Sequence, residues 1–347
     1  MRLLLCTQAV DRNDPNLGFF HRWIEEFAKH CESVTVVCLQ KGDYSFPPHV
    51  TVHSLGKERG GVSRLRYAFR FWKLLLQHHR SYDAVFVHMN PEYLILGGLW
   101  WRLTARRVGL WYVHKSVNWR LRVAIFFSNI VFTATPESFR LKTRKVLVTG
   151  HGIDLGRSVP PRIMEPGVVR LITVGRISPS KHVEVLVDAY GLLKEKLSTT
   201  LKIIGGPVGQ HGVSYEKQLR IQLEHLGEDP KKILLGALPH EQLPQVRAQA
   251  DYFIHASETG SADKSLLDAI MSGLIPCTSS EAYKEILYGY EEELMYKRGD
   301  AETLARCIEK LASLSESERD DMVHTLKERV SKKHSLQNLI PTLLAAL

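Results

Sequence analysis

The sequence contains no apolar run long enough to cross a bilayer, which takes roughly 18 or more consecutive apolar residues. Its two most apolar stretches, 93–101 and 123–132, are shorter and are interrupted by glycine or polar residues. The opening segment MRLLLCTQAV has one arginine and a brief apolar run, which favours a buried first strand over a secretory signal peptide. We therefore expect no membrane-spanning helix.

Cysteine is scarce, and no two cysteines form a C-x-x-C pair. The five are Cys6, Cys31, Cys38, Cys277 and Cys307. This scattered pattern predicts reduced, buried thiols in a cytoplasmic protein and argues against a structural zinc site. The loop after the first expected strand, 11–18, also lacks G-x-G-x-x-G, which argues against a nicotinamide or flavin cofactor. No convincing D-x-D metal site is present either.

Acidic residues are sparse in the first half of the chain. Residues 1–160 hold 23 Lys+Arg and 11 Asp+Glu, whereas residues 161–347 hold 23 and 26. Three basic segments, 60–80, 100–107 and 118–122, place aromatic residues beside arginine. Helices of this kind can lie in the headgroup layer of an anionic membrane. The alternative for each segment is a buried helix with solvated cations. Nucleic acid could use a basic surface too, but no recognised binding motif appears.

Short apolar segments alternate with amphipathic ones along the whole chain. Eleven of them read as strands buried on both faces, as in a parallel sheet covered by helices: 2–6, 33–39, 83–89, 108–115, 130–135, 145–150, 169–175, 201–206, 232–238, 251–257 and 274–280. The pattern predicts an α/β fold with two doubly wound, Rossmann-like domains, at 1–160 and 161–330. The boundary is expected near 157–167, and the C-terminal helix, 331–347, is expected to pack back on the first domain.

The loops that follow the strands are where such sheets bind ligands. Strand 171–174 runs into Gly175, Arg176 and Lys181 before a helix. Gly175 permits a tight turn, and two cations at a helix N-terminus suit a diphosphate. The alternative is two solvated cations in a surface loop. Strand 202–206 ends in two glycines, Gly205 and Gly206, which indicates either a close backbone approach to a ligand or an ordinary loop entry.

A second candidate loop, SETGSAD, precedes a helix that starts near Lys264. Asp263 is the expected N-cap of that helix. Asp268 lies one turn beyond Lys264 on the same face, where its carboxylate could hold two vicinal hydroxyls of a ribose. Backbone amides of Thr259, Gly260 and Ser261 could face a phosphate or a sugar. The alternative is a capped helix with a solvent-facing Lys264–Asp268 pair. In the first half, His88 and His114 each follow a strand, and His114 is the stronger candidate.

The residues that follow the strands of the second half, together with the motifs around them, resemble the family 4 glycosyltransferases of the GT-B fold. In that fold two domains face each other across a cleft. HGID (151–154), VGRISPSK (174–181), LKIIGG (201–206), LLDAIMSGLIP (266–276), EAYKEIL (281–287) and RGDAETLARCI (298–308) match the family's motifs. The resemblance implies that Arg176 and Lys181 bind the donor diphosphate and that Asp268 holds the ribose. It also implies transfer with retention and without a metal, the acceptor entering near Gly18 and His114.

The sequence departs from the family's E-x7-E pair. Gly260 stands where the first glutamate is expected, Glu258 lies two residues earlier, and Asp268 replaces the second glutamate. We therefore expect Glu258, the Thr259–Ser261 backbone, Asp263 or Lys264 to build the sugar-facing end. Gly18 stands where the family often has a glycine pair near the donor phosphates.

The sequence thus predicts a retaining, metal-independent glycosyltransferase, of the hexosyltransferase class, in surface polysaccharide or glycolipid biosynthesis. A nucleotide diphosphate sugar would be its co-substrate, with no further cofactor, and a glycan or lipid-linked molecule its acceptor. The basic half would place it at the inner face of a membrane. Two alternatives are a sugar-nucleotide epimerase on the same scaffold and a non-catalytic nucleotide-sugar or glycolipid binding protein.

Overall fold

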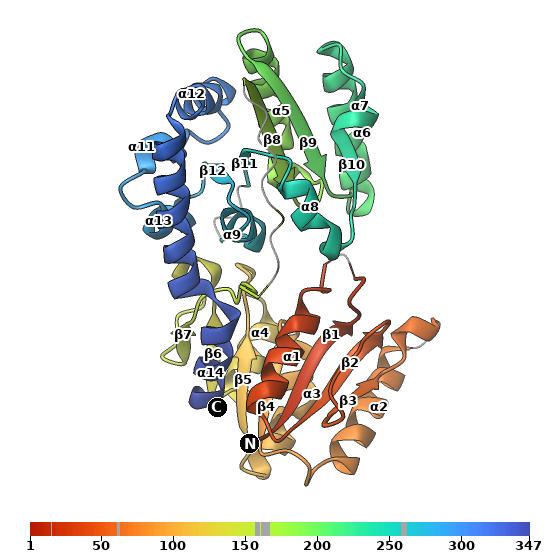
Figure 1. The fold of residues 1–347 in the computed structure, drawn as a ribbon. Coiled ribbons are helices and arrows are strands. Elements are labelled where there is room, and N and C mark those ends of the chain that lie inside the picture. Colours follow the sequence, from red (N-terminus) through yellow and green to blue (C-terminus); the bar gives the residue numbers. More distant parts are fainter. Residues whose placement is uncertain (15, 61–62, 157–159, 161–166, 258–261) are drawn as a thin grey trace. The chain divides into compact units, whose positions relative to one another are not determined.

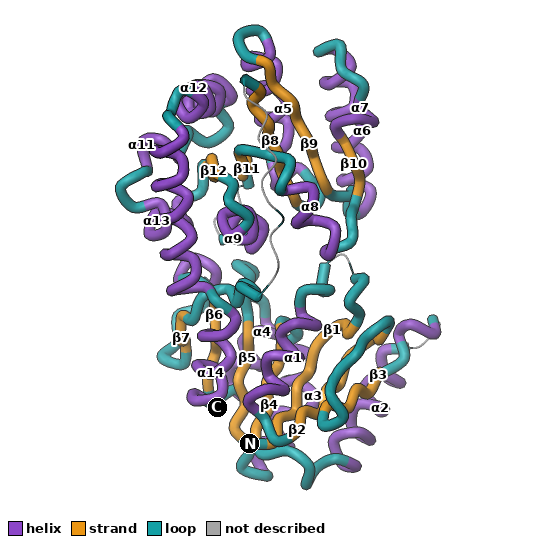
Figure 2. The backbone as a smooth tube through the Cα atoms, in the orientation of Figure 1, coloured by secondary structure: helices purple, strands orange, loops and turns teal. Residues whose placement is uncertain are grey.

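The computed structural model describes residues 1–14, 16–60, 63–156, 160, 167–257 and 262–347. The chain forms two compact units (Figure 1). The first unit comprises residues 1–154 and 333–347, and the second comprises residues 155–332. Most of the expected boundary segment, 157–159 and 161–166, lies outside the described residues. Both units alternate strands with helices, as Figure 2 shows.

The first unit is built on a seven-stranded sheet in the order β3-β2-β1-β4-β5-β6-β7. All pairings between its described strands are parallel. The strands are β1 (Arg2–Val10), β2 (Ser33–Lys41), β3 (Val50–Ser54), β4 (Ala84–His88), β5 (Arg107–Trp111), β6 (Ile130–Thr133) and β7 (Val146–Val148). The sequence predicts each of these except β3, which is partly exposed and therefore lacks a continuous apolar run.

Successive side chains of a strand point to opposite faces of the sheet, and here both faces are apolar. Helices therefore cover both faces. Leu3 and Leu5 pack with α1 (Phe20–His30) and α14 (Leu336–Ala346). Leu4 and Cys6 pack on the other face, with α2 (Arg64–Gln77), α3 (Pro91–Leu103) and α4 (Trp119–Phe127). The C-terminal helix α14 thus belongs to the core of the first unit.

The second unit repeats this plan with a five-stranded parallel sheet in the order β10-β9-β8-β11-β12. Its strands are β8 (Val168–Val174), β9 (Ser198–Ile204), β10 (Leu234–Gly236), β11 (Tyr252–His255) and β12 (Ile275–Thr278). Its helices are α5 (Val183–Lys194), α6 (Gly209–His225), α7 (Pro230–Ile233), α8 (Leu243–Arg247), α9 (Lys264–Met271), α10 (Lys284–Leu287), α11 (Glu291–Leu294), α12 (Ala301–Ala312) and α13 (Glu316–His334), whose last two residues belong to the first unit. The α/β prediction is confirmed in both units.

An arginine–aspartate pair ties the start of the first strand to a neighbouring strand in each unit. In the first unit, Arg2 Nη2 lies 2.7 Å from Asp83 Oδ1, and in the second Arg170 Nη2 lies 2.8 Å from Asp251 Oδ1. Each pair spans 81 residues of sequence. Hydrogen bonds from Arg2 lower the pKa of Asp83 to about 2. The second pair is buried and the first is partly exposed.

The two chain segments that lead between the units are hydrogen-bonded to each other within the first unit. Ile153 N donates to His334 O at 2.5 Å, and Leu336 N donates to Ile153 O at 2.8 Å. His151 N donates to Nδ1 of His334 at 3.1 Å. Burial, with the neighbouring charges of His151 and Lys333, lowers the pKa of His334 to about 3. His334 is therefore held neutral at this junction.

None of the helices in the described parts of the chain is long and apolar enough to span a membrane. The five cysteines are all buried and free. Burial raises the pKa of the Cys31 thiol to about 11.

Candidate functional site

A pocket in the second unit opens at the carboxyl ends of its central strands. Two loops form it, one joining β8 to α5 and the other joining β11 to α9. The described lining residues are Thr173, Val174, Gly175, Arg176, Lys181, Val183, Ile203, His255, Ala256, Ser257, Asp263 and Ser265. Ligands bind at this edge of doubly wound sheets. Of the residues that the sequence predicts for the site, the pocket contains Gly175, Arg176, Lys181 and Asp263.

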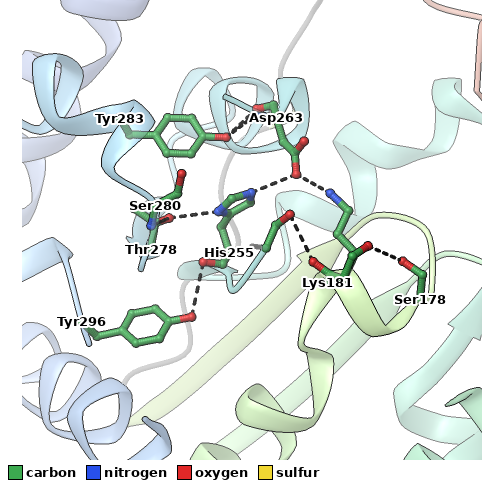
Figure 3. Close-up of polar contacts among 10 residues, drawn as sticks. Ser178, Lys181, His255, Asp263, Thr278, Ser280, Tyr283 and Tyr296 are labelled. Carbon is green, nitrogen blue, oxygen red and sulfur yellow. Dashed lines mark hydrogen bonds and ion pairs between the residues drawn. The ribbon is translucent and has the colours of Figure 1, made fainter. Parts of the chain in front are cut away.

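Three charged or titratable side chains meet in this pocket (Figure 3). The ammonium group of Lys181 donates to Oδ2 of Asp263. Nε2 of His255 lies 2.9 Å from the same oxygen. Because an ionised carboxylate only accepts hydrogen bonds, the ring nitrogen is the donor. Asp263 therefore links the β8–α5 loop, which carries Lys181, to the end of β11, which carries His255.

Hydrogen bonds from neighbouring elements fix His255 in place. Its Nδ1 lies 2.9 Å from Oγ1 of Thr278, and that oxygen accepts from the backbone N–H of Ser280 at 3.1 Å. The hydroxyl of Tyr296 donates to the backbone oxygen of His255 at 3.3 Å. The ring edge of Tyr283 completes the enclosure, with ring centroids 5.2 Å apart. His255 thus has one orientation, with Nε2 directed at Asp263.

The backbone of Asp263 is held by the phenol of Tyr283, which donates to Asp263 O at 3.0 Å and also accepts from Asp263 N. Burial raises the pKa of Tyr283, so the phenol keeps its proton. Burial alone would also raise the pKa of Asp263, but hydrogen bonds and charge from His255 and Lys181 outweigh it and hold that pKa well below its usual range. The carboxylate is therefore ionised at neutral pH.

The structure corrects the predicted role of Asp263. The residue occupies the N-cap position of α9, but its side chain makes no capping hydrogen bond. Its carboxylate is instead used by Lys181 and His255. The sequence analysis did not select His255. The signal that could have found it is a polar residue at the end of an otherwise apolar strand, YFIH.

Arg176 lies beside this cluster and is exposed. The described residues offer its guanidinium no ion-pair partner, so it is available to an anion. The chain bends at the preceding Gly175, whose φ is not in the positive range that would require glycine. Glycine is instead required at Gly205, whose φ is 145° and where a Cβ would lie 1.7 Å from the backbone oxygen of Gly175. The two strand ends therefore touch through backbone alone.

The remaining residues that the sequence predicts for the donor site in the second unit are not among the described lining residues of this pocket, apart from Asp263. Asp268 on α9 lies 3.9 Å from the buried guanidinium of Arg247 on α8. Sequence reasoning did not identify Arg247. Lys264, in the first turn of α9, is partly buried. Glu258, Thr259, Gly260 and Ser261 lie outside the described residues, so their predicted contacts with the sugar stay predictions.

Two predicted residues belong to the first unit. Gly18 has a packing reason to be glycine, because a Cβ there would lie 2.7 Å from the backbone oxygens of Arg12 and Asp14. His114 is exposed, and its Nδ1 accepts from the backbone N–H of Ser116 at 3.0 Å. His88, the other histidine considered, is buried, with its ring stacked on Phe20 at 4.0 Å and its Nδ1 3.3 Å from Thr7 Oγ1. His88 is therefore a core residue.

Part of the chain matches a known protein family, and the whole chain resembles known structures in fold. Residues 165–329 match the family model described as "Glycosyl transferases group 1". The mannosylfructose-phosphate synthase of Agrobacterium fabrum is 22% identical over 149 residues, which is 40% of this chain and 33% of that protein. This chain therefore covers about a third of the length of that relative.

Solved structures resemble the whole chain. HepE from Anabaena, in complex with UDP, has a TM-score of 0.74 at 16% identity, with 100% of both chains covered. Sucrose-phosphate synthase from Thermosynechococcus elongatus has a TM-score of 0.75 at 14% identity, over 99% of this chain and 98% of that one. The fold is that of the GT-B glycosyltransferases.

Proposed function

We propose that this chain, of which residues 165–329 match the glycosyl transferases group 1, transfers a sugar from a nucleotide diphosphate sugar to a glycan or lipid-linked acceptor. The observation that carries this proposal is the pocket in which exposed Arg176 lies next to Lys181. The resemblance in fold to HepE, whose structures hold UDP and UDP-glucose, supports a nucleotide diphosphate sugar as donor.

The charges of the pocket suit the departure of a nucleoside diphosphate. As the glycosidic bond breaks, negative charge grows on the leaving phosphate, and a cation that binds it more strongly in the transition state lowers the barrier. Arg176 and Lys181 take this role, without a metal ion and with retention of configuration. Asp263 and His255 are positioning residues, because they act on the diphosphate only through Lys181.

The residues that would contact the ribose and the transferred sugar are proposed from their positions in the sequence. Asp268 accepts hydrogen bonds from the ribose hydroxyls, and the guanidinium of Arg247 lies 3.9 Å from its carboxylate. The sugar contacts predicted from the sequence for Glu258, Thr259, Gly260 and Ser261 lie outside the described residues and remain predictions. Gly18 and His114 lie on the acceptor side, in the first unit.

Exposed side chains of the first unit support the proposal that the enzyme binds the surface of an anionic membrane. Leu65, Phe69 and Leu76 form an exposed apolar stripe on α2, with 84%, 71% and 50% of their surface accessible. Exposed cations, Arg66 and Lys73 among them, accompany the stripe on the same helix. This combination is typical of helices that lie in the headgroup layer. The enzyme would then act peripherally at the inner membrane face, in surface polysaccharide or glycolipid biosynthesis.

The test measures the shift in melting temperature with UDP, GDP, ADP, CMP and dTDP and their common sugar conjugates. We expect a shift with one nucleotide family that disappears in Arg176→Ala and persists in Arg306→Ala, an exposed arginine on α12. Transfer by Arg176→Ala should fall about 100-fold, as for loss of one transition-state donor. No shift with any nucleotide would overturn the proposal. Binding without turnover would favour a binding protein, and conversion of the donor without acceptor would favour an epimerase.

A further inference from the structure

The first unit contains a cavity of about 540 Å³ that the donor site does not use. We name it the α2–α3–α4 cavity. It lies at the carboxyl ends of β1 and β2, between the starts of these three helices. Its lining residues are Gln8, Leu39, Leu55, Arg64, Tyr67, Ala68, Asn90, Glu92, Tyr93, Ile95, Leu96, Trp119 and Arg120.

The sheet floor of the cavity is exposed where a central strand is normally covered. Gln8 is exposed, whereas every other residue of β1 from Leu3 to Val10 is buried. The strand is paired on both sides, with β2 and β4. Helices cover the rest of this sheet face, so the opening over Gln8 is a gap in the helical layer. Its size falls in the range of small-molecule sites, about 300–1,000 Å³.

The walls of this cavity are mostly hydrocarbon, supplied by aliphatic and aromatic side chains of α2, α3 and the strand ends. Its polar groups are few and include Arg64, Glu92 and Arg120. Arg120 Nη1 lies 3.0 Å from Glu92 Oε1, whereas Arg64 has no ion-pair partner among the described residues. Two arginines against one glutamate leave a net positive charge. The cavity is thus complementary to an apolar chain that carries an anionic group.

The surroundings of the cavity fit a ligand delivered from a lipid layer. Leu65 and Phe69 are exposed on α2 beside the lining residues Arg64 and Ala68. Trp119, which lines the cavity, keeps 64% of its surface accessible. Apolar side chains therefore continue from the inside of the cavity onto the outer surface, as a chain leaving a membrane would require.

We propose that the α2–α3–α4 cavity binds the hydrocarbon chain of a lipid phosphate, with the phosphate held by Arg64 and Arg120. This lipid phosphate is the lipid part of the acceptor, an assignment that rests on the proposed transferase function. The binding itself does not depend on that function and is measured without a nucleotide.

The first experiment is calorimetric titration of the full chain with dodecyl phosphate below its micelle concentration. We expect ethyl phosphate, which has the head without the chain, and dodecyl maltoside, which has the chain without the charge, to bind at least tenfold more weakly. Arg64→Ala and Arg120→Ala should each weaken the binding of dodecyl phosphate about tenfold. Arg122→Ala, which removes an exposed cation of α4 outside the lining, should leave the affinity for dodecyl phosphate unchanged.

The second experiment locates the chain. All native cysteines are buried, so Ala68→Cys supplies a single accessible thiol in the lining. Dodecyl phosphate should slow its alkylation by maleimide at least tenfold, and should not protect Leu76→Cys, which is exposed farther along α2. Equal protection at both positions, or equal binding of ethyl and dodecyl phosphate, would overturn the inference. A chain-dependent result in a protein that gives no nucleotide shift would support the cavity and refute the transferase assignment.

Discussion

Lys181 and His255 approach the same atom, Oδ2 of Asp263, from two different loops (Figure 3). The ammonium group proposed to meet the donor diphosphate is therefore fixed before any donor binds. A carboxylate between two donors also reduces the net positive charge of the empty pocket. The diphosphate must compete with Asp263 for Lys181, so Asp263 both positions the lysine and moderates its affinity for anions.

Asp263→Asn should damage transfer more than it damages donor binding. The neutral amide still contacts Lys181 and His255 but no longer orients them by charge. We expect kcat to fall about tenfold or more, with a smaller change in KM, because positioning matters most in the transition state. Steady-state kinetics gives the split. The free energy of unfolding should fall by about 1–3 kcal/mol, since charged hydrogen bonds are lost.

Asp321→Asn, an exposed change on α13, is the matched control and should leave both quantities unchanged. Equal kcat in Asp263→Asn and the parent chain would show that Lys181 needs no positioning by this carboxylate.

Stability should decline as pH falls below neutral because of His334. Its pKa is about 3 in the folded chain and about 6.5 when unfolded. Between these values the unfolded chain binds one more proton, so the free energy of unfolding falls by up to about 1.4 kcal/mol per pH unit. The stabilisation is complete above pH 6.5 and is lost progressively towards pH 3. Urea unfolding at several pH values measures the slope.

His334→Asn tests this assignment because the amide oxygen can still accept from His151 N–H but does not titrate. The variant should show a shallower slope between pH 6.5 and 4, by close to one proton. His324→Asn, an exposed histidine on α13, should keep the parent slope. Identical slopes in all three proteins would locate the pH dependence elsewhere.

Gly205→Ala should disrupt the candidate donor site, whereas Gly206→Ala should not. A Cβ at Gly205 would meet the backbone oxygen of Gly175 at 1.7 Å, and its φ of 145° disfavours other residues. A Cβ at Gly206 would meet Ala237 at 3.6 Å, an ordinary contact. We expect a loss of at least about 2 kcal/mol for the first change and loss of the nucleotide shift. Equal stability of both variants would contradict the close approach of the two strand ends.

The buried pair of the second unit should matter more for stability than its partly exposed counterpart. Asp251→Asn leaves Arg170 charged in a buried place, which costs about 3–5 kcal/mol. Asp83→Asn leaves Arg2 in contact with solvent, so its cost should be clearly smaller. Parallel denaturant titrations compare the two. A larger loss for Asp83→Asn would contradict the difference in burial.

Much of the fold followed from the sequence because parallel strands buried on both faces produce continuous apolar runs. The exception, β3, is an edge strand with partly exposed residues, and its sequence VTVHS gives a weaker signal. The helix α14 was expected by its pattern, yet its partners in the core, such as Leu3 and Leu5, are set by tertiary contacts. Local sequence patterns indicate an element, but not the surface that it covers.

The candidate site was less predictable than the fold because it also depends on tertiary contacts that local patterns do not indicate. Glycine and cations after β8 indicated a phosphate loop, so Arg176 and Lys181 were found. His255 and Asp263 are 74 and 82 residues from Lys181 along the chain, and nothing local to either predicts that they meet it. Asp263 also carries a good N-cap signal, which the stronger charge of Lys181 and the imidazole of His255 override.

The repeated arginine–aspartate pair gives the two units a common reference point. The strands next to each pair share one register, with Leu3 opposite Ala84 and Leu171 opposite Tyr252. Counting on from the arginine, the fifth residue is Thr7 in one unit and Gly175 in the other. Thr7 is buried, and its carbonyl accepts a hydrogen bond from the hydroxyl of Tyr93, whereas Gly175 is exposed and is followed by the exposed Arg176. Equivalent positions at the ends of these strands are thus buried in the first unit and exposed in the second. A shared strand register therefore leaves the residue type and its exposure at this position free to differ between the two units.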